Sequence, residues 1–259
     1  MTLISILIGT LAAGIGSVWL AAALSFGLLA RYTQHMLSLA AGALMATAFM
    51  HLLPEAFESQ IGPQQLFMAL LASLVFFFLL DKAELWHHGH EHHHEGDTGS
   101  HSHGEHSHHI HQAGSWSVLA GDSVHCFGDG ILIASAFMAD LRLGALAALA
   151  VLVHEVPHHM GDLMVLRQST DSRKAAIIKV SLAGALTALG GFTGFWLVDQ
   201  LREYLPYFLV VASSSFIYVA LADLIPQLQK RLSLQQTVAQ VAWLLVGMGL
   251  VAVVGRLAH

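Results

Sequence analysis

The chain has 259 residues, of which 55% are hydrophobic and 11% are charged, and its formal net charge at pH 7 is −6 with every histidine counted as neutral. The mean hydropathy is +0.63, and a soluble domain of this length needs far more polar surface than these residues supply. The composition therefore excludes a soluble globular domain and predicts one integral membrane domain over residues 1–259.

Long apolar segments divide the chain. A membrane-spanning α-helix needs about 20 mainly apolar residues, and eight segments meet or approach that length. None of them shows the short polar–apolar alternation of a membrane β-strand. The sequence therefore predicts an all-α polytopic membrane protein with eight transmembrane helices. They cover residues 3–30, 36–56, 64–85, 117–140, 144–167, 176–199, 206–228 and 235–257.

Basic residues are distributed unevenly between the two sides of this predicted bundle. Eight of the eleven Lys and Arg residues fall in the first, third, fifth and seventh connections or in the helical turn next to them. Cytoplasmic loops carry the excess of basic residues. We therefore expect the odd-numbered connections in the cytoplasm and both termini outside, in a plasma or inner membrane.

A short internal similarity links the second and seventh helices. The second contains AFMHLLPE at residues 48–55 and the seventh ALADLIPQ at residues 220–227, and aligning the prolines pairs His51 with Asp223. The two helices run in opposite directions, so the first three and last three helices would form an inverted repeat, as in many transporters. On this hypothesis His51 and Asp223 line a transport path. The similarity is short, and chance is the alternative explanation.

The third connection is rich in histidine. Residues 87–111 hold 12 histidines with several acidic residues and almost nothing that could form a core. We expect residues 87–114 to be a disordered cytoplasmic loop inside the single transporter domain. Imidazole-rich tracts bind transition metals loosely. The tract is thus either an accessory in metal handling or a solvated linker that chelates metal incidentally.

The fifth helix carries five ionisable side chains in nine residues, in the sequence HEVPHHMGD at residues 154–162. Such residues are expensive in lipid and normally face a bundle interior or a water-filled path. Side chains four positions apart stand one above the other on a helix. His154 and His158 therefore form one stripe, and Glu155 and His159 form a second stripe beside it.

The fourth helix offers matching ligands. His125 and Asp129 are four residues apart, and a short turn at residues 140–144 makes the fourth and fifth helices antiparallel neighbours. The polar residues of both helices therefore reach one depth. Three imidazoles and one carboxylate, from His125, Asp129, His154 and His158, match a four-coordinate site for Zn²⁺ or a similar ion.

These motifs resemble those of the ZIP family of divalent metal transporters. HCFGDG at residues 125–130 is similar to the family's HNFxDG motif, and residues 154–162 are similar to its HExPHExGD motif. The resemblance extends to HLLPEA, YVALADLIPQ and the histidine-rich third loop, and so covers nearly the whole chain. It implies a 3+2+3 helix arrangement and uptake of Zn²⁺ into the cytoplasm, with Cd²⁺, Fe²⁺, Mn²⁺ and Co²⁺ as further substrates.

The resemblance also implies two metal sites. Cys126 stands where the family motif has Asn, and His159 stands where it has a second Glu. Thiolate and imidazole are softer ligands than amide and carboxylate, so the second site is altered or absent and the family's metal selectivity transfers only in part. The primary site would be His125, Asp129, His154 and His158, and the adjacent site would involve Cys126, Glu155 and His158, with His159 beside them.

Two other functions stay open. Residues 154–158 also match the HExxH motif of zinc proteases, in which the Glu is a general base, although an internal proline argues against that helix. A membrane-bound metal sensor that does not transport is the third reading. We predict a transporter rather than an enzyme. Its expected partners are divalent metal ions and the lipid bilayer, without nucleic acid, and a homodimer is left open.

Overall fold

The computed structural model describes residues 2–25, 33–89, 107–169, 172–228 and 233–257, and all regular structure in these ranges is helical. Three of the predicted spans are divided by a π-helical turn, labelled η. The segments are α1 (Thr2–Leu11), η1 (Ala12–Gly16), α2 (Ser17–Ser25), α3 (Thr33–Thr47), η3 (Ala48–Leu52), α4 (Leu53–Phe57), α5 (Pro63–Gly89), α6 (Ser107–Ala139), α7 (Leu141–Ser169), α8 (Arg173–Gln200), η4 (Arg202–Tyr204), α9 (Leu205–Tyr218), η5 (Val219–Leu224), α10 (Ile225–Leu228) and α11 (Leu234–Leu257).

Seven of the continuous helical spans in the described residues are long and apolar enough to cross a membrane. The fourth predicted span, α6, is not among the seven, because Asp122, His125 and Asp129 interrupt its apolar sequence. It is nevertheless 33 residues long and packs against α7 and α8. The protein is therefore an all-α polytopic membrane protein, in which each of the eight predicted helices is found.

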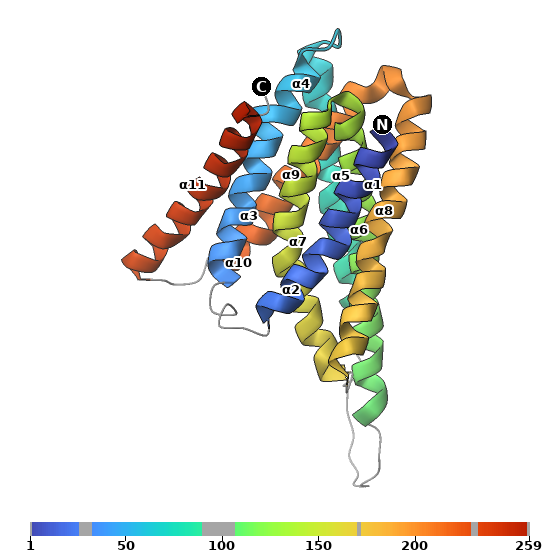
Figure 1. Ribbon diagram of the computed structural model, residues 1–259, viewed down its shortest axis with the longest axis vertical. Helices are drawn as coiled ribbons and strands as arrows, with labels where there is room; N and C mark the ends of the chain where they lie inside the picture. The colour runs from blue at the N-terminus through green and yellow to red at the C-terminus, as the bar shows by residue number, and fades with distance from the viewer. Residues whose placement is uncertain (1, 26–32, 90–106, 170–171, 229–232, 258–259) are drawn as a thin grey trace.

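Packing between the helices is reciprocal (Figure 1). The helix α5 from the first half of the chain packs against α9 from the second half. Correspondingly, α11 from the second half packs against α3 from the first half. In the same way η3 contacts α9 while η5 contacts α3. Three spans precede the central pair α6 and α7, and three follow it, so the arrangement is 3+2+3 with the pairing of an inverted repeat.

The internal sequence similarity corresponds to a shared local distortion. Both η3 and η5 come directly before a helix with proline at its second position, Pro54 in α4 and Pro226 in α10. Proline lacks an N–H group and clashes with the carbonyl one turn earlier. A wider π turn at that point accommodates the proline without ending the span.

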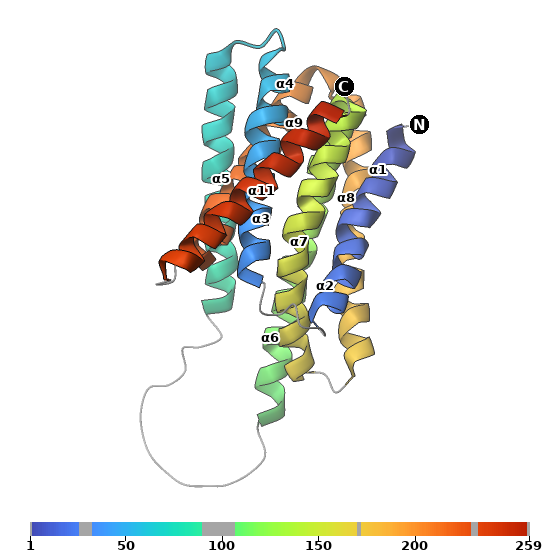
Figure 2. The ribbon, with the colours of Figure 1, turned by 60° about the vertical axis from the view of Figure 1, so that its left-hand side comes forward.

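The two ends of the described chain lie at the same end of the bundle (Figure 2). The start of α1 and the end of α11 both lie at this end, whereas the ends of α5 and α6 that flank residues 90–106 lie at the opposite end. An even number of crossings requires this arrangement. It agrees with the relative placement of termini and third connection that the sequence predicts, and it leaves open which side faces the cytoplasm.

The helices on either side of the histidine-rich segment are longer than predicted. α5 continues to Gly89 and α6 begins at Ser107, so the two ends of the predicted loop 87–114 are helical. A helix that is already nucleated gains one backbone hydrogen bond for each added residue, which carries it into polar sequence. The rest of the tract, residues 90–106, lies outside the described residues.

Close helix contacts through glycine fix α8 against its neighbours. A Cβ atom at Gly190 of α8 would overlap the carbonyl oxygen of Phe127 on α6. A Cβ atom at Gly14 of η1 would overlap the carbonyl oxygen of Gly184 on α8. Small residues that let backbones touch are the usual means of helix association in membranes. Through α8, the first span and α6 are therefore held in one fixed register.

Candidate metal centre

A tight turn makes α6 and α7 antiparallel neighbours. The side chain of Asp140 accepts hydrogen bonds from the backbone N–H groups of Arg142, at 2.8 Å, and Leu143, at 3.4 Å. Asp140 thus caps the start of α7 directly after α6 ends. The polar residues in the middle of each helix consequently lie at the same depth, as the sequence predicts.

The first group of ligands, here called the imidazole cluster, consists of His125, Asp129, His154 and Glu155. One ligand atom from each residue lies within 4.8 Å of every other. The Nε2 atom of His154 is 3.4 Å from Asp129 Oδ2, 3.1 Å from Glu155 Oε1 and 3.4 Å from His125 Nε2. The Nε2 atom of His125 is 3.3 Å from Glu155 Oε1 and 3.8 Å from Asp129 Oδ2.

These separations match a tetrahedral ion. With metal–ligand bonds of about 2.0–2.1 Å, as for zinc with nitrogen or oxygen, two ligands of a tetrahedron are about 3.3–3.4 Å apart. Most of the pairs in the imidazole cluster lie within a few tenths of an ångström of that value. The cluster therefore has the spacing that a bound Zn²⁺ requires, before any side chain moves.

The ring of His154 is held in the orientation that metal binding needs. Its Nδ1 atom is 3.3 Å from the carbonyl oxygen of Ala150, one turn earlier in α7. A carbonyl can only accept, so Nδ1 carries the proton and the lone pair of Nε2 faces the cluster. A hydrogen bond at the ring nitrogen that does not bind the metal fixes the tautomer of a metal-binding histidine.

The ring of His158 lies close to the imidazole cluster. Its centroid is 5.8 Å from that of His125 and 5.9 Å from that of His154, nearly the same as the 5.7 Å between His125 and His154. Glu155 joins His125, Asp129 and His154 in the group of mutually close ligand atoms, and the role of His158 as a ligand stays a prediction. Pro157 within α7 leaves the carbonyl of Val153 without its usual helical donor, which loosens the backbone at this turn.

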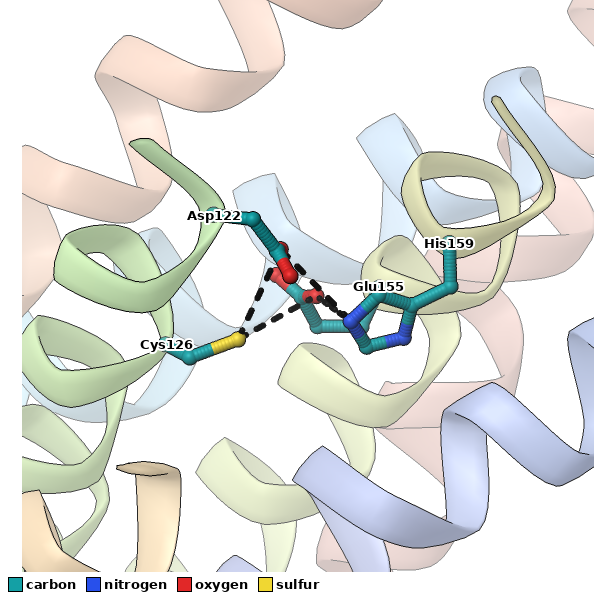
Figure 3. A group of neighbouring side chains, drawn as sticks. All are labelled: Asp122, Cys126, Glu155 and His159. Carbon is teal, nitrogen blue, oxygen red and sulfur yellow. Dashed lines mark hydrogen bonds and ion pairs between the residues drawn. The ribbon is translucent and has the colours of Figure 1, made fainter. Parts of the chain in front are cut away.

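The second group, here called the cysteine cluster, consists of Asp122, Cys126, Glu155 and His159 (Figure 3). The Nε2 atom of His159 is 3.1 Å from Glu155 Oε2 and 3.6 Å from Asp122 Oδ1. The Sγ atom of Cys126 is 3.7 Å from Asp122 Oδ1 and 4.0 Å from Glu155 Oε2. The four side chains point toward one another from α6 and α7.

Glu155 joins the two clusters. Its Oε1 atom faces His125 and His154, and its Oε2 atom faces His159 and Cys126. One carboxylate can therefore bridge two adjacent ions, one oxygen to each. The sequence analysis gave Glu155 only to the adjacent site, because helical spacing shows which residues share a stripe and not which stripes face each other.

Asp122 is a candidate ligand that the sequence analysis did not include. It lies four residues before Cys126, and Glu155 lies four residues before His159. Two such pairs on facing helices form a square of ligands, and this spacing is the signal that could have identified Asp122.

The ligands of the imidazole cluster are buried, apart from His125, so ionising them costs free energy. Asp129 is 3% exposed, and Glu155 and His154 are each 1% exposed. An ionised Asp at the centre of a membrane helix costs about 2.5–3.5 kcal/mol, so acidic groups this close together need compensation. Asp129 Oδ2 and Glu155 Oε1 lie close to the histidine Nε2 atoms, but within the described residues these contacts do not have hydrogen-bond geometry. A dication between these oxygens would bind them directly and offset their charge.

Comparison with known proteins identifies the family. Residues 81–255, which include both clusters, match the family model described as ZIP zinc transporter. The chain belongs to this family. The match spans more than half of the sequence and includes α6 and α7 in full.

Curated relatives of this ZIP chain carry zinc transporter names. Zinc transporter ZIP10 of Homo sapiens is 34% identical over 152 residues, which are 57% of this chain and 18% of that protein. Zinc transporter foi of Drosophila melanogaster is 33% identical over 141 residues, which are 54% of this chain and 20% of that protein. The chain thus spans about a fifth of these two relatives. Zinc transporter ZIP13 of Pongo abelii is 29% identical over 254 residues, or 88% of this chain and 70% of that protein.

Membership of the ZIP family sets aside the protease interpretation of HExxH, since these relatives are named as transporters and not as enzymes. Cys126 and His159, the two residues that differ from the motifs quoted in the sequence analysis, both lie in the cysteine cluster. The imidazole cluster keeps the residue types of the motifs. The departures are therefore concentrated on one side of Glu155.

The two predicted path residues belong to neither cluster. His51 lies in η3, and its ring packs so closely on α11 that a Cβ atom at Gly255 would overlap it. Asp223 lies in η5, and its side chain is outside the described part of the structure. A role for either residue in a metal path stays a prediction.

Proposed function

We propose that this chain transports divalent transition-metal ions, with Zn²⁺ as the main substrate, into the cytoplasm through the imidazole cluster. The observation that supports this proposal most directly is the tetrahedral spacing of four ligand atoms from His125, Asp129, His154 and Glu155. Imidazole and carboxylate together suit zinc and related borderline ions. Cd²⁺, Fe²⁺, Mn²⁺ and Co²⁺ are the further substrates in this proposal.

The chemistry of the transport step is ligand exchange. An arriving hydrated ion loses water and gains two neutral imidazoles and two carboxylates, so the bound ion and its ligands are neutral overall. Neutrality matters at membrane depth, where an uncompensated charge is expensive. His125, which is 34% exposed, is the ligand on the open side of the cluster, and it would meet the ion first.

The movement that opens the cluster to either side is a rocking or sliding of helix groups about α6 and α7. The packing supports two groups. Close backbone contacts tie the first span to α8 and α8 to α6, and α2 packs against α7. The helices α3, α5, α9 and α11 pair among themselves. The contacts of α3 with α7 and of α9 with α6 form the boundary across which the groups would shift.

The direction of transport follows from the expected topology. The excess of Lys and Arg in the odd-numbered connections favours a cytoplasmic side that also holds the histidine-rich residues 90–106. In this proposal the tract receives released metal and is an accessory, because both candidate clusters lie on α6 and α7. A homodimer also stays a prediction, which the mass of the solubilised protein tests.

Metal flux into liposomes tests the function. Purified protein in vesicles with a zinc-sensitive dye inside should produce zinc entry, and His154→Ala should remove most of it. The matched control is Ser135→Ala, which changes a buried polar residue of α6 that belongs to neither cluster. Stoichiometric zinc binding without any flux would instead establish the sensor and overturn the transporter.

A further inference from the structure

A serine from the first span contacts the cysteine cluster from outside the α6–α7 pair. The Oγ atom of Ser17, at the start of α2, is 3.0 Å from the Nδ1 atom of His159. Both side chains are fully buried. Ser17 and His159 are 142 positions apart in the chain, so the contact depends on how the first span docks against α7.

The local backbone explains how Ser17 reaches this position. Ser17 follows directly after the π turn η1, and Gly14 within that turn lies against Gly184 of α8. No larger residue at Gly14 would allow this approach, because its Cβ atom would overlap the Gly184 carbonyl oxygen. The glycine contact brings the first span close to α8 and so directs the Ser17 hydroxyl toward α7. π turns of this kind occur frequently at functional sites.

The direction of the hydrogen bond between Ser17 and His159 is determined by a second contact. The Ser17 hydroxyl lies 2.7 Å from the carbonyl oxygen of Gly14. A hydroxyl has one proton and a carbonyl has none, so Ser17 donates to Gly14. The hydrogen bond with His159 must then use the histidine proton, and Nδ1–H donates to the Ser17 oxygen.

The consequence for His159 is a fixed tautomer. With its proton on Nδ1, the neutral ring presents the lone pair of Nε2, and this atom faces Glu155 at 3.1 Å and Asp122 at 3.6 Å. A metal ligand must present a lone pair, and the group that holds the opposite ring nitrogen orients the ligand.

We propose that Ser17 is a positioning residue of the cysteine cluster, which holds His159 as a ready ligand for a thiophilic divalent ion such as Zn²⁺, Cd²⁺ or Co²⁺. The inference rests on one part of the proposed function, namely that the cysteine cluster binds metal. Its basis is the fully buried chain of contacts from Gly14 through Ser17 and His159 to Glu155. Loss of such an orienting group typically costs 10–100-fold in metal affinity.

The experiment is a Co²⁺ titration of the purified protein in detergent. Charge-transfer absorption from thiolate to cobalt reports occupancy of the cysteine cluster alone, and its loss in Cys126→Ser verifies the origin of the band. Ser17→Ala should raise the Co²⁺ concentration at half-saturation by about 10–100-fold. Ser17→Thr keeps the hydroxyl and should restore most of the affinity. Ser135→Ala removes a comparable intrahelical hydrogen bond on α6 and should leave the titration unchanged.

Three results would overturn the role of Ser17. These are an unchanged titration in Ser17→Ala, an equal loss in Ser17→Ala and Ser17→Thr, and an equal loss in Ser135→Ala. A wild-type protein that binds Co²⁺ without any thiolate band would instead remove the cysteine cluster from the proposed function, and the Ser17 proposal with it.

A second readout needs no metal and separates these failures. The imidazole ¹⁵N resonances of His159, identified by their absence in His159→Gln, should show protonated Nδ1 and unprotonated Nε2 in the metal-free wild type. Ser17→Ala should give a mixture of tautomers. A wild-type ring protonated on Nε2 would overturn the assignment, whatever the titration gives.

Discussion

The imidazole cluster and the cysteine cluster lie on the same two helices and share Glu155, but they differ in access and support. His125 leaves the imidazole cluster open on one side, whereas in the cysteine cluster Asp122 is 7% exposed and Cys126 is fully buried. The Nδ1 atom of His154 faces a carbonyl of its own helix, and that of His159 faces a serine of another span. We therefore expect the open cluster to exchange metal with water, and the closed cluster to modify which metal is preferred.

The largest effect should come from the residue that both clusters share. Glu155→Ala removes a ligand from each and leaves the neighbouring imidazoles without their closest carboxylate. Because even an orienting group is typically worth 10–100-fold, we expect zinc flux to fall by about 100-fold or more in the liposome assay. The matched control is Glu58→Ala, an exposed carboxylate at the end of α4, which should transport normally. Substantial flux in Glu155→Ala would show that the clusters do not act through a common ligand.

The next comparison separates two histidines on one stripe of α7. His154→Ala removes a ligand of the imidazole cluster and should reduce zinc flux by at least about ten-fold. His158→Ala should cost less, because His158 is not in the group of four residues whose ligand atoms all lie within 4.8 Å of one another. Initial rates of zinc entry, measured at equal amounts of reconstituted protein, give the order of the two effects. The opposite order would return His158 to the primary ligand set that the sequence predicts.

A smaller change should follow from Cys126→Asn, which replaces the thiol by the residue type of the family motif. The imidazole cluster is left intact, so zinc flux should stay substantial. Manganese prefers oxygen ligands, and cadmium prefers sulfur. The ratio of cadmium to manganese flux, measured in competition, should therefore fall. An unchanged ratio would make Cys126 a packing residue, and complete loss of zinc flux would make it a principal ligand.

The smallest effect is expected from deletion of residues 90–106, which joins the observed ends of α5 and α6 through a short linker. Both clusters stay intact, so zinc should still be carried, with a changed dependence on zinc concentration. The check is a set of flux curves over a range of zinc concentrations, with a glycine–serine linker of equal length as the control. A variant that inserts normally and carries no zinc would place an essential site in the tract.

Much of the fold follows from local sequence, because hydrophobic length marks each span and the turn at Asp140 makes α6 and α7 neighbours. The sequence also predicts that His125, Asp129 and His154 lie together, as they do in the structure, since spacing by four residues puts side chains on one stripe. It does not fix the rotation of each helix about its axis. Tertiary contacts such as that of Gly190 with α6 determine that rotation.

The contacts that the sequence analysis did not predict are those that depend on the rotation of each helix. Glu155 lies in the imidazole cluster as well as in the cysteine cluster because the second stripe of α7 also faces α6. Asp122 shares a stripe with Cys126. It becomes a candidate ligand only because the structure places Glu155 and His159 of α7 opposite that stripe. Ser17 is a single hydroxyl in an apolar span, and nothing in its local sequence marks it as a neighbour of His159.

The measurement that tests the account most directly is a structure determined with bound zinc, in which anomalous scattering locates the ions. The account predicts two ions on opposite sides of the Glu155 carboxylate. One should lie among His125, Asp129 and His154, and the other should contact Cys126 and His159. Ions found only away from α6 and α7, or a Glu155 carboxylate that contacts no ion in a zinc-loaded protein, would contradict the shared centre.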